Sequence, residues 1–207
     1  MVINDAKFTV AVTPMAYEQT VDHLMRLLDK VNELGIRIKL LVLDAGYYSI
    51  KVINYLKAHG IKFIMRAPGN GKFKAGDDFM YTTIHDHENI SKQATFRVVA
   101  FNGKDKFGHT EFFVFATNTD LKPGQIRKMF RKRWAIETSY RMIGMFLPKT
   151  TSKVYNLRKL YFYLAVMLYN LWVLVNYQSD ERVIVQHVKL MVMLDVILSM
   201  IYTIVDG

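Results

Sequence analysis

The spacing of apolar residues near the start of the chain predicts a strand followed by a helix. In residues 8–13 (FTVAVT) apolar residues alternate with small or hydroxylic ones, which is typical of a strand, and Pro14 would end it. In residues 17–34 the apolar positions recur at helical spacing, and Gly35 follows as a stop. The first part of the chain therefore predicts a β–α unit.

Two unbroken apolar runs follow, in residues 38–44 (IKLLVLD) and 61–67 (IKFIMRA). Such runs are typical of strands that are covered on both faces. Between them, residues 50–59 predict a helix that Ser49 caps and Gly60 ends. The order strand, helix, strand, helix, strand favours a mixed or parallel α/β sheet.

The pattern changes at Pro68. Residues 79–84 predict a weak strand, and residues 94–101 and 111–117 alternate in the way expected of the two arms of a hairpin. We interpret residues 68–118 as a β-rich insertion into the α/β core.

The last part of the chain predicts helices. Residues 122–130 have Pro123 in the first turn and lead into residues 131–141 (RKRWAIETSYR), for which an amphipathic helix is the natural interpretation. Residues 156–177 and 181–205 predict two long apolar helices. The predicted domains are residues 1–67, 68–118 and 119–207.

Composition and charge narrow the class of protein. The chain has 207 residues, 51% of them apolar, so it can bury a substantial core. A net charge of +10 predicts attraction to a polyanion, either nucleic acid or an anionic membrane. The sequence has no cysteine, which excludes disulfides, thiolate catalysis and cysteine-ligated zinc and favours an intracellular setting.

Two carboxylates are the main candidates for chemistry. Asp44 ends a predicted buried strand, at the edge where open α/β sheets place their sites. Glu137 lies four residues after Arg133 and four before Arg141. On the same predicted helix an apolar stripe is supplied by Phe130, Trp134, Ile136 and Tyr140. The alternative for Asp44 is a structural role as a capping or turn residue. The alternative for Glu137 is a salt bridge to its neighbouring arginines on a surface helix. Together the two acids could hold Mg²⁺, which prefers oxygen ligands.

The two segments carry a family resemblance. LLVLDAGYYS, a helix and IKFIMRA resemble the second-aspartate segment of the DDE transposases of insertion sequences, whose core is RNase H-like. FRKRWAIETSYRMI resembles their signature helix, written as Tyr, two residues, Arg, three residues, Glu, six residues, Lys. Phe130, Arg133 and Glu137 take the Tyr, Arg and Glu places.

The sequence also departs from that pattern. The Lys position falls on Gly144, with Lys149 nearby but out of register, and Phe130 has no hydroxyl. The family's first catalytic aspartate lies on the first strand of the fold, and Asp5 lies on the wrong element to replace it. We therefore expect an RNase H-like mixed α/β sheet without its first two strands or first metal ligand, with the β-rich insertion and C-terminal apolar helices.

The resemblance implies metal-dependent phosphoryl transfer on DNA. Asp44 and Glu137 would be catalytic residues that bind Mg²⁺ or Mn²⁺, and Arg133, Arg141 and Lys149 would bind DNA phosphates. The implied partners are transposon ends, target DNA and further copies of the chain, with no membrane, in the cytoplasm and at the nucleoid. Two carboxylates are too few to hold the two metal ions that this reaction uses, so we expect the chain alone to be inactive.

Two weaker motifs remain. His85 and His87, followed by Glu88, have the spacing of metal ligands on a strand, but exposed polar residues are the better interpretation. His109 lies on the hairpin, and an exposed polar loop residue is the better interpretation there too. The segment around Phe96, Arg97 and Phe101, with Lys104 and Lys106 in its loop, is either a contact to the DNA backbone or an ordinary solvated hairpin.

Two alternatives to a transposase follow from charge and hydropathy. One is a basic protein that binds DNA without chemistry. The other is a membrane hairpin, because residues 160–177 carry no charge. Against the membrane stand Asn170 and Asn176 in that helix and charges such as Arg182 and Asp195 in the next. We expect both helices to be buried in a core, with some uncovered apolar surface that promotes self-association.

Overall fold

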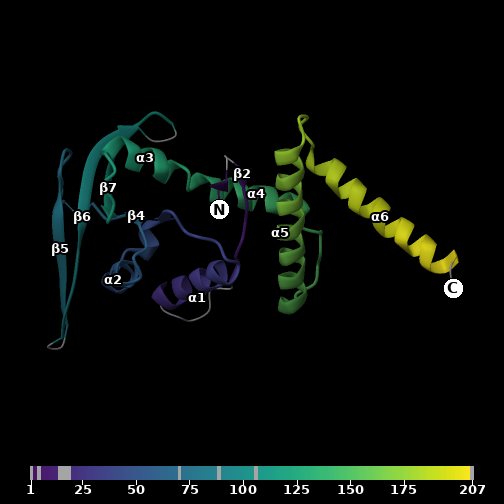
Figure 1. Cartoon of the computed structure of the whole chain (residues 1–207), viewed down its shortest axis with the longest axis horizontal. Helices are drawn as coiled ribbons and strands as arrows, with labels where there is room; N and C mark the ends of the chain where they lie inside the picture. Colours follow the sequence, from purple (N-terminus) through teal and green to yellow (C-terminus); the bar gives the residue numbers. More distant parts are fainter. Residues whose placement is uncertain are drawn as a thin grey trace. The chain divides into compact units, whose positions relative to one another are not determined.

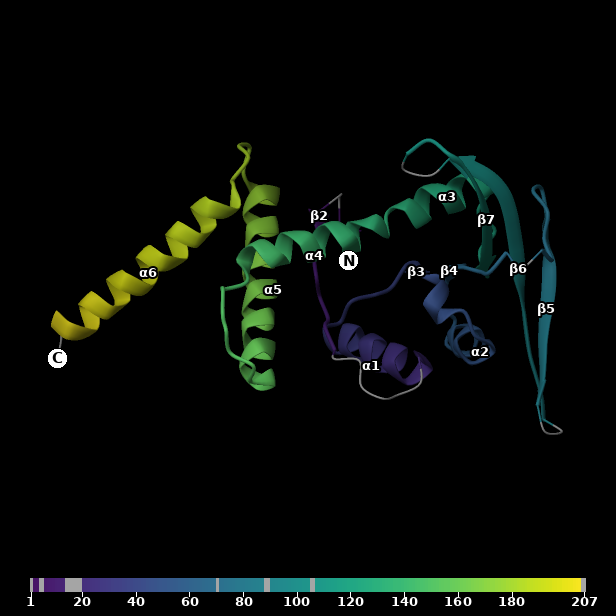
Figure 2. The same cartoon turned by 180° about the vertical axis from the view of Figure 1, so that it is seen from behind.

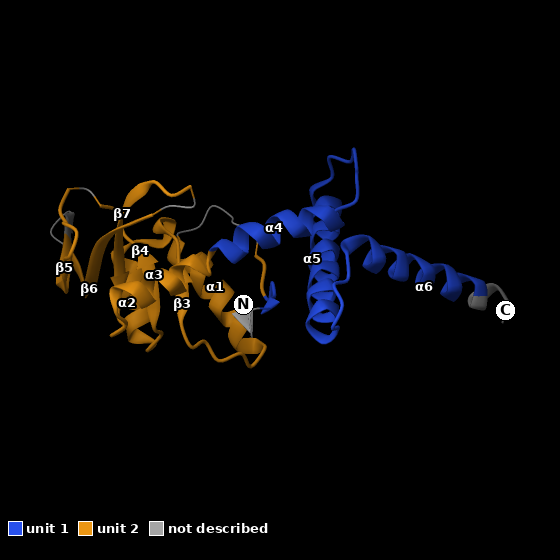
Figure 3. Ribbon diagram, turned by 90° about the horizontal axis from the view of Figure 1, so that it is seen from above, with its two compact units in different colours: residues 1–10, 134–207 blue, residues 11–133 orange. Residues whose placement is uncertain are grey.

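The computed structural model describes residues 2–3, 6–13, 20–69, 71–87, 90–104 and 107–205. The chain divides into two compact units, shown in orange and blue in Figure 3. We call residues 11–133 the sheet unit, and residues 1–10 with 134–207 the helical unit. Asp5, Pro14, Glu88 and Lys106, which were considered above, lie outside the described residues.

The sheet unit contains one five-stranded sheet of order β3-β4-β7-β6-β5 (Figure 1). Its strands are β3 (Leu41–Leu43), β4 (Phe63–Arg66), β5 (Asp78–His87), β6 (Ile90–Lys104) and β7 (Thr110–Thr117). β3 and β4 are parallel, and the other neighbours are antiparallel. The predicted strands and hairpin are confirmed with altered bounds. Because β7 pairs directly with β4, the prediction of a separate β-rich insertion is not confirmed.

The helices of the sheet unit are α1 (Thr20–Glu33), the short 3₁₀ helix η1 (Ala45–Tyr47), α2 (Ile50–Ala58) and α3 (Pro123–Arg131). The predicted stop and cap are confirmed. Gly35 has a φ of +67°, which glycine adopts without strain, and the Ser49 hydroxyl accepts a bond from the Val52 N–H.

Both faces of β4 are covered within this unit. Along β4, Phe63 and Met65 pack on the side of α1 and α2, whereas Ile64 packs on the side of α3. Figures 1 and 2 show α2 and α3 on opposite sides of β4. Because alternate side chains meet two different apolar clusters, the sheet unit forms an α/β/α arrangement with its own core.

The helical unit consists of β1 (Val2–Ile3), β2 (Ala6–Lys7), α4 (Trp134–Phe146), α5 (Tyr155–Gln178) and α6 (Val185–Val205). The prediction of a strand over residues 8–13 is wrong. The Thr9 N–H donates to the Asn170 side chain at 2.9 Å, and the Asn170 amide donates to the Thr9 carbonyl at 2.7 Å. One asparagine thus satisfies the backbone groups that a neighbouring strand would otherwise pair.

The prediction that the two C-terminal helices are buried is wrong for most of their length. In α5 the buried residues are Ala165, Val166, Tyr169 and Val173, and in α6 Val185 and Val188 are buried. By length and composition α5 could also cross a membrane, since an 18-residue window has a mean hydropathy of 1.4. The expected uncovered apolar surface is therefore present on both helices.

Candidate functional site

Asp44 follows β3 at its carboxyl end, as expected for a site residue of an open α/β sheet. It is also the N-cap of η1, where its Oδ1 accepts a hydrogen bond from the Ala45 N–H at 2.8 Å. Its side chain is 54% exposed. The capping role that was weighed as an alternative is therefore real, and it leaves the second carboxylate oxygen to face other groups.

That second oxygen meets Arg133. The Arg133 Nη1 lies 3.2 Å from the Asp44 Oδ2, and the arginine side chain is only 18% exposed. The Arg133 guanidinium also lies 5.3 Å from the centre of the Phe130 ring. The structure thus brings together two candidate residues that are 89 positions apart in the sequence. An arginine held between a ring and a carboxylate has little freedom to leave that place without a competing anion.

The segment that carries Arg133 is not one helix, so the prediction for residues 131–141 is wrong in this respect. α3 ends at Arg131, α4 begins at Trp134, and Arg133 lies in the turn between them. The spacing of four residues between Arg133 and Glu137 would put both side chains on one face only if both were in the same helix. Arg133 lies in a turn, so this inference does not hold.

Phe130 explains why Arg133 is held in place. The family resemblance puts Phe130 at the position of the signature tyrosine, whose hydroxyl group phenylalanine lacks. In the structure it is a core residue, 5% exposed, whose ring packs edge-on against Phe115 with centres 4.8 Å apart. Leu40 and Val42, which precede Asp44, pack against the same cluster. One apolar cluster therefore supports both members of the Asp44–Arg133 pair.

Glu137 and Arg141 lie on α4 in the helical unit, and both are exposed. The buried face of α4 is formed by Ala135, Ser139, Ile143 and Phe146. The predicted apolar stripe is wrong at its end, because Ile136 and Tyr140 are 50% and 60% exposed. Lys149 follows α4 and is also exposed.

Arg97 has a structural role that its sequence did not reveal. Its guanidinium makes two bonds to the Asp78 carboxylate, at 2.6 and 2.7 Å, and donates to the carbonyls of Thr119 and Leu121. The bonds between the two side chains lower the pKa of Asp78 and raise the pKa of Arg97. Arg97 therefore ties β5 and β6 to the segment before α3.

The structure does not test the histidine motif, because the side chains of His85 and His87 lie outside the described residues. Among the side chains that are described, no group of three or more His, Cys, Asp or Glu could hold a metal ion.

Comparisons with known proteins agree with the sequence resemblance. Residues 7–171 match the family described as the transposase DDE domain. Among solved structures, the chain is similar to a piggyBac transposase in a synaptic complex with hairpin DNA, studied by cryo-EM, with a TM-score of 0.52 and 10% identity. That similarity covers 81% of this chain but only 37% of the other chain, and at this identity it shows the fold alone. A search of curated proteins finds no match. The family match covers most of the sequence, and the chain belongs to the transposase DDE domain family.

Proposed function

We propose that this chain is part of the catalytic core of a DNA transposase that performs metal-dependent cleavage and joining of DNA strands. The observation that carries the proposal is Asp44, at the carboxyl end of β3 and paired with Arg133 of the family's signature segment. The helix between the parallel strands β3 and β4 also supports an RNase H-like arrangement of this part.

Asp44 and Glu137 are the proposed metal-binding acids. Carboxylate oxygens are the ligands that Mg²⁺ and Mn²⁺ prefer, and both side chains are exposed enough to exchange partners. When bound, divalent ions stabilise the attacking and leaving oxygens of the phosphodiester. DDE transposases generally use such ions. Two acids are fewer than a two-ion cage requires, so we expect no cleavage by this chain alone.

Arg133 is the proposed phosphate-binding residue beside Asp44. Its planar guanidinium matches the spacing of phosphate oxygens, and in the absence of DNA it neutralises the aspartate. Arg141, one helical turn beyond Glu137, and Lys149 are proposed as further phosphate contacts because both are exposed cations. The substrate would be the transposon ends and target DNA.

We propose that copies of this chain associate with one another through α5. Five large apolar residues on α5 are exposed and follow one another at intervals of four and three residues: Leu160, Leu164, Met167, Leu171 and Leu174. This is the spacing of the contact seam between two packed helices. We propose that α5 of one copy packs against α5 of another.

DNA binding with and without Mg²⁺ tests the proposal. The chain should bind duplex DNA more tightly with Mg²⁺, and Asp44→Asn and Glu137→Gln should remove that response. Asp29→Asn and Glu181→Gln, at exposed acids elsewhere in the two units, serve as matched controls. DNA binding that neither Mg²⁺ nor the two site variants affect would instead favour a non-catalytic DNA-binding protein.

Cleavage of supercoiled DNA by the purified chain is the second readout. The expected result is no nicking at any Mg²⁺ or Mn²⁺ concentration. Metal-dependent nicking that Asp44→Asn abolishes would show that the acids suffice, and would contradict the expectation that the chain alone is inactive.

A further inference from the structure

The segment that contains α3 is the most basic part of the sheet unit. Residues 122–133 (KPGQIRKMFRKR) contain six basic residues and no acidic one, against 28 basic and 18 acidic residues in the whole chain. Of these six basic residues, only Arg133 contributes to the candidate site. The remaining basic residues therefore have no role in the chemistry described above.

α3 separates its apolar and basic residues onto opposite faces. Ile126 and Phe130 are buried against the sheet, in the cluster that contains Ile64, Val99, Phe113 and Phe115. Lys128 and Arg131 lie about half a turn away from Ile126 at 100° per residue, and Lys132 follows them. All three are exposed. We call Lys128, Arg131 and Lys132 the α3 basic face.

The backbone before α3 and the end of α3 are both held in place by contacts with the rest of the sheet unit. Before the helix, Arg97 donates to the carbonyls of Thr119 and Leu121 at 2.8 and 2.9 Å. At its end, Phe130 is held in the core. Along its flank, Arg127 donates to the Lys104 carbonyl at 2.7 Å. A basic face on a fixed helix binds an anion without first ordering its own backbone.

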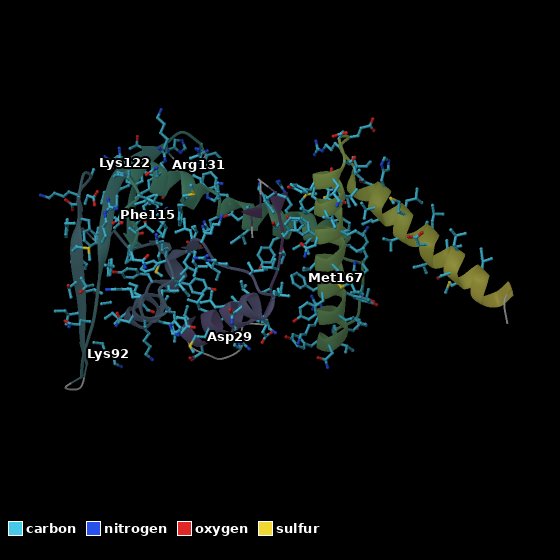
Figure 4. All side chains as sticks on the ribbon, in the orientation of Figure 1. Asp29, Lys92, Phe115, Lys122, Arg131 and Met167 are labelled. Atoms are coloured by element: carbon cyan, nitrogen blue, oxygen red, sulfur yellow. The ribbon has the colours of Figure 1, made fainter. Side chains whose placement is uncertain are left out.

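We propose that the α3 basic face binds the phosphate backbone of duplex DNA. This inference rests on the proposed function and adds a contact surface to it, separate from Arg133, Arg141 and Lys149. Figure 4 labels Lys122 and Arg131 at the two ends of α3. From Lys122 to Lys132 a helix rises by about 15 Å. Since phosphates follow one another about every 3.4 Å of axis per strand, this length matches roughly four phosphates.

Duplex DNA fits this face better than a membrane surface does. A helix that binds membranes inserts an exposed apolar face below its cations. The apolar residues Ile126 and Phe130 of α3 are instead buried in the sheet unit, at 0% and 5% exposure. The exposed face of the helix can therefore contact a partner mainly through its positive charge. Electrostatic attraction also dominates the binding of proteins to the phosphate backbone of nucleic acids.

Gly124 allows a sharp test, because it lies one turn before Lys128 on the same face. A side chain added there meets no atom within 4 Å of its Cβ, and its φ is not in the left-handed region. Gly124→Lys, Gly124→Gln and Gly124→Glu have similar helix propensity but differ in charge. Near a helix N-terminus Glu is more stabilising than Lys, so stability should follow the order Glu, Gln, Lys.

DNA affinity should follow the reverse order, Lys, Gln, Glu. We expect a difference of at least tenfold between Gly124→Lys and Gly124→Glu in fluorescence anisotropy with a short duplex at low salt. Because stability and affinity run in opposite directions, damage to the fold cannot produce this result. Equal DNA affinity in the three variants would overturn the proposal.

Salt dependence gives the second test. The triple variant Lys128→Gln, Arg131→Gln, Lys132→Gln should lower the slope of log affinity against log salt by about 0.9 for each phosphate that the chain no longer binds. The matched control replaces Lys30, Lys39 and Lys62, exposed lysines elsewhere in the sheet unit, with Gln. Although it removes the same charge, it should change the slope much less.

The outcomes separate this inference from the proposed function. If the wild-type chain binds duplex DNA and the two triple variants behave alike, the α3 basic face is not a contact surface, and the proposed function stands. If the wild-type chain binds no DNA at any salt concentration, both fail. Binding to vesicles of anionic lipid that Gly124→Glu weakens, without DNA binding, would mean that the face serves a membrane, and would overturn the proposal.

Discussion

The two units of the chain differ in how they cover apolar surface. In the sheet unit, α1 and α2 pack on one face of the sheet and α3 on the other, so alternate strand residues are buried in two clusters. In the helical unit, α5 and α6 expose large apolar residues along most of their length. The sheet unit has a core of its own, whereas the helical unit exposes large apolar residues that its own packing does not cover.

α6 shows this difference most clearly. Its exposed apolar residues, which include Leu190, Met191, Met193 and Val196, are not confined to one side of the helix. A helix that is apolar all round is typical of one surrounded by other protein or by lipid. Helical periodicity predicts that such a helix exists, but it does not predict what covers it.

The largest expected effect is on the core of the sheet unit. Phe115 is 0% exposed and contacts Phe113 and Phe130, so Phe115→Ala should lower the free energy of unfolding by about 3–5 kcal/mol. Met167→Ala, at a residue of α5 that is 66% exposed, should change the free energy of unfolding of the monomeric chain by less than about 0.5 kcal/mol. Figure 4 labels both residues. Unfolding in urea measures the change in the free energy of unfolding for each variant. Equal changes in the two variants would contradict the contrast between the units.

The next effect is on self-association through α5. Leu164→Glu with Met167→Glu places charges in the exposed seam, where packing of a second helix would bury them. We expect at least tenfold weaker association in sedimentation equilibrium, with unchanged helix content. The matched control is Met80→Glu with Ile84→Glu, at residues of β5 that are 64% and 58% exposed. Association that the control weakens as much would count against the α5 seam.

A smaller gain is expected at Gly144 on α4. A side chain there meets no atom within 4 Å of its Cβ, and glycine inside a helix costs about 0.5–1 kcal/mol relative to a good helix former. Gly144→Lys restores the lysine of the family signature and should raise both thermal stability and DNA affinity. Gly144→Gln should give the same stability without the gain in affinity. Similar affinity for both variants would argue against a DNA contact at this position.

The smallest effect concerns pH. Bonds from Arg97 lower the pKa of Asp78 below its usual 3.8 in the folded chain. The stabilisation is therefore fully present above the pKa of the unfolded chain and is lost as pH falls through the lower folded value. Because the Asp78 side chain is 37% exposed, its size should stay below about 1 kcal/mol. NMR titration should show the pKa of Asp78 rise in Arg97→Gln; an unchanged pKa would rule out Arg97 as the cause.

Much of the sheet unit could be predicted from the sequence, because its elements have local signals. Apolar runs marked β3 and β4, Ser49 capped α2, and Gly35 and Gly60 ended the helices before them. The same signals placed Asp44 at the end of a strand. Its pairing with Arg133 was not predicted, since no local pattern joins residues 89 positions apart.

The wrong predictions share a physical cause. Alternation in residues 8–13 predicted a strand, but Asn170, far away in the sequence, binds both backbone groups of Thr9. Helical spacing ran through residues 131–141, but the chain turns after Arg131, and Ile136 became exposed. In each case a tertiary contact or a break decided the outcome, and local propensity does not contain that information.

Binding of Mn²⁺ to the isolated chain tests the central claim, that Asp44 and Glu137 are metal ligands, most directly. Electron paramagnetic resonance counts free Mn²⁺ and needs neither DNA nor activity. We predict that Asp44→Asn and Glu137→Gln each weaken Mn²⁺ binding at least tenfold, while Asp29→Asn and Glu181→Gln leave it unchanged. Mn²⁺ binding that is equal in the wild-type chain and both site variants would contradict the claim.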